Sequence, residues 1–159
     1  VDSHGQVVGV AEGEWWRLIT ATFLHYGPLH LGLNMLALWW FGAAIEQVLG
    51  RGRYLLLYVV SGLAGAAGAL IFSPTSPTVG ASGALFGLLL SFGMLFPDRI
   101  IVPLFPPIPM KAKYFVAIFG ALELLLGIYG GGGIAHFAHL GGMLGAYLLI
   151  RYWRTARRR

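Results

Sequence analysis

The sequence predicts an all-α, polytopic bundle of transmembrane helices with five spans, and three observations support this fold class. Of the 159 residues, 57% are hydrophobic and only 11% are charged, whereas an average soluble domain carries about 25% charged residues. The mean hydropathy is +0.74. The few charges are separated by long apolar runs, so that only Glu46, Arg51 and Arg53 are charged between residues 27 and 95. These features exclude an ordinary soluble domain.

The elements follow one another as a single membrane domain over residues 1–159. Polar and aromatic residues are mixed in residues 1–27, which predicts an outer segment at the membrane surface. Apolar runs predict spans at about 28–48, 54–72, 79–96, 114–129 and 134–152. Glycine, proline and charged residues mark the connections at 50–53, 73–78, 97–113 and 130–133. Residues 153–159 form a basic tail.

The basic residues predict the orientation of the chain. Ten of the 11 lysines and arginines lie at 51–53, 99–113 and 151–159, after the first, third and fifth spans. All three groups then fall on one side of the membrane, which the positive-inside rule places in the cytoplasm together with the C-terminus. The tail is interpreted as an anchor beside anionic lipid, not as a nucleic-acid site. Because residue 1 falls outside and no signal-peptide pattern is present, we expect one further transmembrane helix upstream.

Polar groups inside apolar spans are the candidate functional residues, because such groups are costly to bury in lipid. Four of them lie near the outer ends of their spans. Three spans could therefore direct a serine, two histidines and an amide to one point. The full set comprises His30, Asn34, Glu46, Ser82, Glu123, His136 and His139. Cysteine is absent, which excludes disulfides, a thiolate nucleophile and cysteine-ligated metals.

Ser82 lies in Gly80-Ala81-Ser82-Gly83, where small neighbours would expose its hydroxyl at a helix N-terminus beside free N–H groups. This arrangement suits a serine nucleophile with an oxyanion hole, and the alternative is close helix packing. His139 could be the base or an interfacial histidine with a satisfied hydrogen bond. His136, expected nearer the surface, is given the second interpretation. No acid is expected near His139, which predicts a Ser–His dyad and not a triad.

His30 and Asn34 are four residues apart and share a helix face. They are interpreted either as donors to a developing oxyanion or as hydrogen bonds between packed helices. A metal site is the less favoured alternative, because HExxH is absent and no acid is expected on the outer side beside the histidines. No metal or other cofactor is therefore expected. The histidines of that alternative are His25, His30, His136 and His139.

Two glutamates remain inside the spans. Glu46 lies close to Arg51 and Arg53, which favours a structural ion pair or a role at the helix end. Glu123 lies in the middle of the fourth span. It could be a buried structural acid or part of a polar path, and the sequence does not decide between them.

Together these residues resemble the rhomboid family of intramembrane serine proteases, in family order and over nearly the whole chain. The family core has six spans, and the one missing here is the first. The matching motifs are Glu14-Trp15-Trp16-Arg17; His25 with His30-Leu31-Gly32-Leu33-Asn34; Gly42 with Glu46 and Gly50; Gly80-Ala81-Ser82-Gly83; and Ala138-His139-Leu140-Gly141-Gly142.

The resemblance implies a role for each matching position. Ser82 would be the nucleophile and His139 the general base, with an oxyanion hole formed by the Ser82 N–H, His30 and Asn34. The fourth span would be the substrate gate. The supporting positions would be Trp16 and Arg17 in a loop that braces the fold at the membrane surface, Phe86 packed on the His139 ring, and His25, Glu46, Gly80, Gly83 and Gly142.

The implied function is intramembrane serine endopeptidase activity, in which transmembrane substrates are cut near the outer membrane face through an acyl-enzyme. The expected partners are transmembrane substrates and membrane lipid, without nucleic acid or metal. The expected location is the bacterial cell (inner) membrane, with the active site facing the outer side. Two alternatives stay open: a rhomboid-like protein that binds membrane clients without cutting them, and a small transporter.

Overall fold

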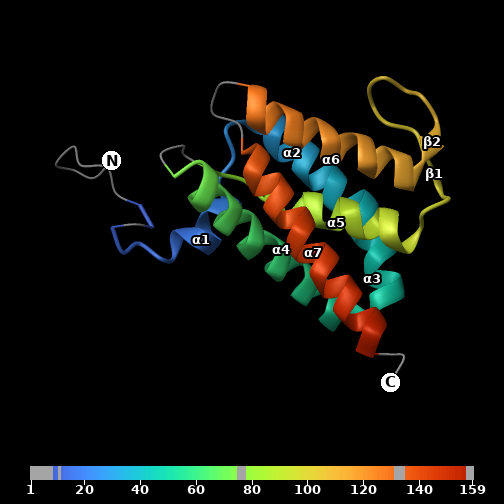
Figure 1. Cartoon of the computed structure of the whole chain (residues 1–159), viewed down its shortest axis with the longest axis horizontal. Coiled ribbons are helices and arrows are strands. Elements are labelled where there is room, and N and C mark those ends of the chain that lie inside the picture. The colour runs from blue at the N-terminus through green and yellow to red at the C-terminus, as the bar shows by residue number, and fades with distance from the viewer. Residues whose placement is uncertain (1–8, 11, 75–77, 131–134, 157–159) are drawn as a thin grey trace.

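The computed structural model describes residues 9–10, 12–74, 78–130 and 135–156, and its elements are almost all helices (Figure 1). The all-α bundle expected from the sequence is confirmed. The helices are α1 (Arg17–Thr20), a 3₁₀ turn (Ala21–Phe23), α2 (Pro28–Ala37), a π-helical turn (Leu38–Gly42), α3 (Ala43–Leu49), α4 (Arg51–Phe72), α5 (Ser82–Leu95), α6 (Ala112–Tyr129) and α7 (His136–Ala156); the strands are β1 (Ile100–Ile101) and β2 (Met110–Lys111).

Among the residues that the structure describes, three helical segments are long and apolar enough to cross a membrane. They are Pro28–Leu49, which joins α2 to α3 through the π-helical turn, Arg51–Phe72 and Ala112–Tyr129. Helix α5 is apolar but shorter, with 14 residues. Large apolar side chains remain exposed on the outer faces, as at Leu55 on α4, Leu125 on α6 and Leu144 on α7. Such an apolar exterior suits contact with lipid.

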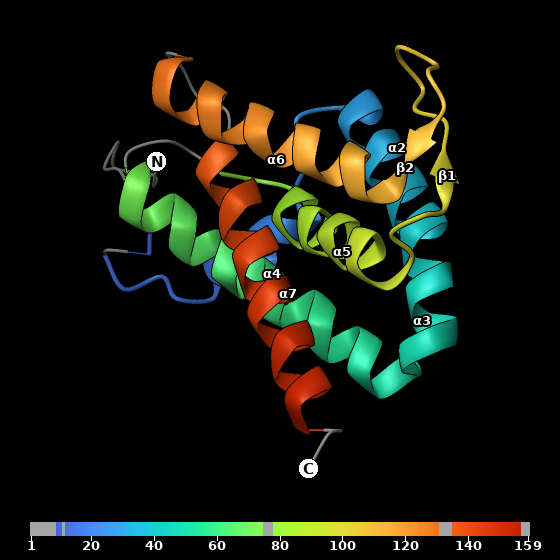
Figure 2. The same cartoon turned by 45° about the vertical axis from the view of Figure 1, so that its right-hand side comes forward.

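Helix α5 is the centre of the bundle. Figures 1 and 2 show it between α7 and the α2–α3 segment, with α4 and α7 side by side and α6 along the outer edge. Helix α5 has no polar face, so it is stable where neighbouring helices surround it and its side chains do not have to contact water. The buried residues of α5 are Ala84, Leu85, Gly87, Leu88, Leu89, Ser91, Phe92 and Gly93.

Glycines let α4, α5 and α7 touch main chain to main chain. A Cβ atom on Gly65 of α4 would lie 2.8 Å from the carbonyl oxygen of Ala138 and 3.3 Å from Gly83 Cα. A Cβ atom on Gly142 of α7 would overlap the carbonyl oxygen of Gly83. Small residues allow this close approach between helices in a membrane. The contact brings the start of α7 against the start of α5.

The helix bounds differ from the expected spans at several ends. Arg51 and Arg53 were expected in a turn, but they lie in the first turn of α4, because Gly50 alone reverses the chain with φ +78°. Helix α6 begins at Ala112, and a short antiparallel hairpin, β1 with β2, occupies the loop that was expected to lack regular structure. Of the connections expected at 73–78 and 130–133, residues 75–77 and 131–133 lie outside the described residues.

Arg53 and Arg154 lie at one end of the bundle. Helix α7 continues through the start of the expected tail to Ala156. There the guanidinium of Arg53 lies 5.6 Å from the centre of the Trp153 ring, and Arg154 donates a 2.6 Å hydrogen bond to the carbonyl of Met94 near the end of α5. We call this the basic end. Ser82 lies at the opposite end of α5.

Candidate active site

The chain turns sharply just before Ser82, and Gly80 makes this turn possible. Gly80 has φ +102°, a conformation that residues with a side chain rarely adopt. Its N–H donates a 2.9 Å hydrogen bond to the carbonyl of Ala21. Helix α5 then begins at Ser82, so the first N–H groups of the helix lie beside the serine hydroxyl without partners inside the helix.

Ser82 and His139 are hydrogen-bonded. The distance between Ser82 Oγ and His139 Nε2 is 2.8 Å, and the pair is partly buried. Phe86, one turn further along α5, stacks on the His139 ring with centroids 4.0 Å apart and planes 7° apart. The imidazole is thus held between an aromatic ring and a hydroxyl. The structure therefore brings together the serine, histidine and phenylalanine that the sequence singled out.

His30 and Asn34 of α2 lie on the other side of the turn. A Cβ atom on Gly80 would lie 2.8 Å from His30 Cε1, 3.1 Å from His30 Nε2 and 3.5 Å from Asn34 Nδ2. A side chain at position 80 would therefore displace the His30 ring and come into contact with the Asn34 amide. Helices α2, α5 and α7 thus each bring a polar side chain to this end of the bundle.

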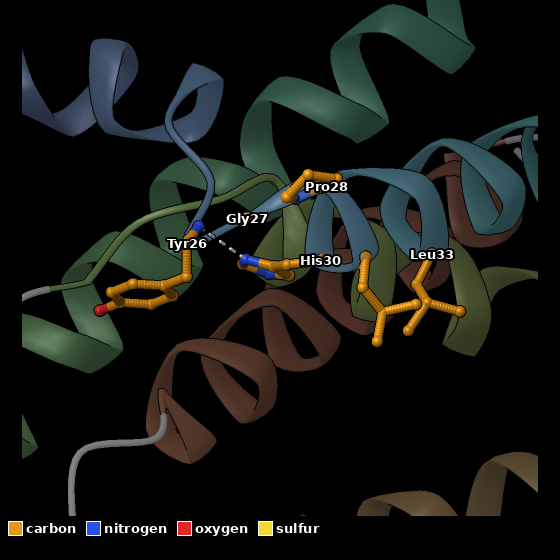
Figure 3. Close-up of a pocket in the computed structure, with 6 residues that line it drawn as sticks. Tyr26, Gly27, Pro28, His30 and Leu33 are labelled. Atoms are coloured by element: carbon orange, nitrogen blue, oxygen red, sulfur yellow. Dashed lines mark hydrogen bonds between the residues drawn. The ribbon is translucent and has the colours of Figure 1, made fainter.

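The hydrogen bonding of His30 and Asn34 leaves donors available. The Tyr26 N–H donates to His30 Nδ1 at 3.3 Å, as Figure 3 shows, so a neutral ring carries its proton on Nε2. Asn34 is buried, and its amide nitrogen has no hydrogen-bond partner within the described part of the chain. A buried donor without a partner costs free energy. The Asn34 amide therefore has N–H groups that could still donate a hydrogen bond.

A hollow opens beside His30 at the start of α2. Its volume is about 450 Å³, and Figure 3 shows the side chains that line it. The lining is mostly apolar, and His30 is the only titratable side chain in it apart from Tyr26. The lining residues are Tyr26, Gly27, Pro28, Leu29, His30 and Leu33.

Glu123 lies beside His139, which the sequence interpretation did not expect. One carboxylate oxygen of Glu123, on α6, is 2.9 Å from His139 Nδ1 and 2.7 Å from His136 Nδ1. All three side chains are 10–13% exposed. The expectation that no acid lies near His139 was therefore wrong. His136, expected nearer the membrane surface with a satisfied hydrogen bond, is buried within the bundle and has such a hydrogen bond.

The same three residues are the one group of potential metal ligands in the described residues. Their ligand atoms lie within 4.8 Å of one another. The premise used against a metal site, that no acid accompanies the histidines, fails here. His25 is not part of this group. Its ring lies beside that of His30, edge-on, with centroids 5.1 Å apart.

The remaining sequence candidates lie away from this cluster. Arg17 pairs with Glu14 at the start of α1, and Trp16 is 58% exposed. Glu46, near the end of α3, forms no ion pair with any residue that the structure describes, so the expected pairing with the nearby arginines was wrong. Its carbonyl accepts the N–H of Gly50, consistent with a place at the helix end.

Comparison with known proteins gives one family. The profile of the Rhomboid domain matches residues 12–155. The chain is 51% identical over 80 residues to rhomboid protease GluP of Bacillus subtilis, covering 50% of this chain and 16% of that protein. It is 38% identical to the putative rhomboid protease YdcA of the same organism, covering 91% of this chain and 70% of that protein.

A plant relative extends the similarity beyond bacteria. The chain is 39% identical over 143 residues to RHOMBOID-like protein 4 of Arabidopsis thaliana, which covers 87% of this chain and 35% of that protein. The chain therefore spans between a sixth and about two thirds of the length of these three relatives. The profile match and the similarity to YdcA together assign the fold and the family. The chain belongs to the rhomboid family.

Proposed function

We propose that this chain is the core of an intramembrane serine endopeptidase. Ser82 is the nucleophile and His139 the general base. The observation that carries the proposal is the 2.8 Å hydrogen bond between Ser82 Oγ and His139 Nε2, which joins residues 57 positions apart in the sequence. A nucleophile within hydrogen-bond reach of a base, itself oriented by a further contact, is the pattern of nucleophilic catalysis.

The reaction follows from this pair. Ser82 Oγ attacks the carbonyl carbon of the scissile peptide bond while His139 Nε2 takes the hydroxyl proton. The C–N bond then breaks, His139 returns that proton to the leaving amine, and the substrate acyl group stays on Ser82 as an ester. Water, deprotonated by His139, hydrolyses the ester and regenerates the serine.

The donors around Gly80 support an oxyanion hole. The developing negative charge on the substrate oxygen would be met by the Ser82 N–H, His30 Nε2–H and the Asn34 amide. Support comes from the start of α5 at Ser82, from the hydrogen bond that leaves His30 Nε2 protonated, and from the unpartnered Asn34 nitrogen within the described residues. Donors fixed before the reaction stabilise such charge most effectively.

The proposed substrates are transmembrane helices cut near the outer membrane face. The chain is an integral membrane protein by its family and its helices. Its basic end would lie in the cytoplasm with the C-terminus, which sets the Ser82 end toward the outer side of a bacterial cell membrane. Helix α6, at the edge of the bundle (Figure 2), would be the gate for substrate, as the resemblance implies. The relatives named as proteases support the activity class.

The test uses the full chain purified into proteoliposomes with a transmembrane reporter substrate. We expect the wild-type protein to cut the reporter and to react with a fluorophosphonate at Ser82. The Ser82→Ala and His139→Ala variants should lose cleavage, because they remove the nucleophile and the base. Cleavage by Ser82→Ala would overturn the proposal, and a wild-type protein that binds the reporter but neither cuts nor labels would favour the client-binding alternative.

A further inference from the structure

We propose that Glu123 is a positioning residue for His139, so that the base is held by a carboxylate on α6 as well as by Ser82 on α5. The inference rests on the proposed function and adds a third residue to it. Three helices then meet at one imidazole ring. Ser82 contacts Nε2, Glu123 contacts Nδ1, and Phe86 covers one face of the ring.

The position of the ring proton follows from these contacts. For His139 to accept the serine proton, its Nε2 must carry a lone pair, so a neutral ring must carry its proton on Nδ1. An ionised carboxylate only accepts hydrogen bonds, and Glu123 Oε2 is 2.9 Å from Nδ1. The carboxylate thus selects the tautomer that catalysis requires. It also opposes the positive charge that the ring acquires when Nε2 takes the proton.

His136 holds the carboxylate in place. Its Nδ1 is 2.7 Å from the same oxygen of Glu123, and its side chain is 10% exposed. Burying a carboxylate inside an apolar helix is costly unless donors compensate it. Two imidazole N–H groups do so here, one from His139 and one from His136. His136 therefore helps to offset the free-energy cost of burying the Glu123 carboxylate at this position.

The distances favour hydrogen bonds over metal coordination. Ligand atoms about 2.0–2.1 Å from a tetrahedral zinc ion lie roughly 3.3 Å apart. The two distances from Glu123 Oε2 are 2.7 and 2.9 Å, which is the range of charge-assisted hydrogen bonds. The three side chains are thus arranged to share protons with one oxygen and not to surround a cation.

The experiment compares Glu123→Leu with Glu123→Gln in proteoliposomes. Leucine fits an apolar helix and removes the acceptor, whereas glutamine keeps an oxygen that can accept both N–H groups but removes the charge. We expect kcat to fall about 10²–10⁴-fold in Glu123→Leu, as when the acid of a catalytic triad is removed. The fall should be smaller in Glu123→Gln, and KM should stay within a factor of about three in both. Leu55→Ala, an exposed apolar residue on the outer face of α4, is the control and should leave kcat unchanged.

A spectroscopic readout separates positioning from a merely structural role. In protein labelled with ¹⁵N-histidine, His139 of the wild type should show a protonated Nδ1, and Glu123→Leu should shift the ring toward protonation at Nε2. His136→Asn, which retains a donor near the position of Nδ1, should lose less activity than His136→Leu. A shifted tautomer together with the graded loss of kcat would support the proposal.

The outcomes distinguish the two proposals. If the wild-type protein cuts the reporter and labels at Ser82, but Glu123→Leu does both at the wild-type rate, the positioning role is overturned and the protease stands. If the wild type neither cuts nor labels, both proposals fall. If a chelator abolishes activity and zinc restores it, a metal site replaces the hydrogen bonds and the positioning role is overturned.

Discussion

Replacing Gly142 with alanine should separate the catalytic pair without touching it. Gly142 lies three residues after His139 on α7 and faces the start of α5. A Cβ atom there would overlap the carbonyl oxygen of Gly83 and lie 2.7 Å from its carbonyl carbon. The Ser61 carbonyl oxygen, 3.3 Å away on α4, closes the other side. Because all of these atoms are main chain, no side-chain rotation can make room.

The magnitude follows from the contact. Carbon atoms pack at about 3.5 Å or more, so the Gly142→Ala methyl needs roughly another 0.8 Å from the Gly83 carbonyl carbon. The overlap with the carbonyl oxygen makes this the minimum shift. If α7 moves away by at least that amount along the line to α5, the 2.8 Å bond between Ser82 and His139 lengthens to about 3.6 Å or more, where it ceases to be a hydrogen bond. Misplacement by about 1 Å can cost about 10²-fold in rate. Overpacking should also cost about 1–3 kcal/mol of stability.

The assay measures kcat on a transmembrane reporter, the rate of fluorophosphonate labelling and the thermal midpoint in detergent. Gly62→Ala is the matched control, since a Cβ atom there would find Ala84 Cβ at an ordinary 3.6 Å. It should leave all three quantities near their wild-type values. A folded Gly142→Ala protein that cleaves within threefold of the wild type would refute the reasoning.

Three further predictions follow from single contacts. Asn34→Ala should lower kcat about 10²–10³-fold with little change in the thermal midpoint, and an unchanged kcat would remove Asn34 from the oxyanion hole. Phe86→Leu should lose the stacking on His139, lowering unfolding free energy by at least about 0.5–1.5 kcal/mol, as denaturation in detergent would measure. Hydrogen bonds from Lys113 and Lys111 lower the pKa of Asp98. The small stabilisation of the folded state by the ionised Asp98 should therefore be present above the ordinary carboxyl pKa and be lost as pH falls through the lowered pKa. Asp98→Asn should remove that acid-dependent part of the thermal midpoint, and an identical pH profile would contradict it.

The helical bundle and the meeting of Ser82 with His139 could be anticipated because they depend on strong, local signals. Apolar runs must be helical in lipid, since no water is available to satisfy the backbone. Basic residues after alternate spans then fix which helix ends lie together. Once Ser82 and His139 are placed at the same end, small residues on both helices allow them to touch. These arguments need neither side-chain detail nor long-range pairing.

The place of Glu123 was missed because it depends on how two helices face each other. Glu123 lies seven residues before Gly130, and His136 and His139 follow the four-glycine run closely in the sequence. Two helices joined over so few residues pack antiparallel, which places the acid and the histidines at similar depth. That matching depth was a usable signal. Helix rotation, however, decides whether the acid faces α7 or lipid, and one sequence does not specify rotation. The extent of α4 back to Arg51 was missed for a simpler reason, because one left-handed glycine can replace a four-residue turn.

The polar cluster and the glycine contacts depend on each other. A charged carboxylate inside an apolar helix is destabilising unless donors reach it, and His136 and His139 reach Glu123 only from α7. Helix α7 in turn reaches α5 closely enough for His139 to meet Ser82 only because Gly83 and Gly142 carry no side chain. A methyl group added between α5 and α7 would therefore lengthen the hydrogen bond between Ser82 and His139. The hydrogen bond between Glu123 and His139 would be kept if α6 moved with α7, and it would break if α6 stayed in place. The close contact between α5 and α7 is thus needed both for the stability of the buried carboxylate and for the hydrogen bond between Ser82 and His139.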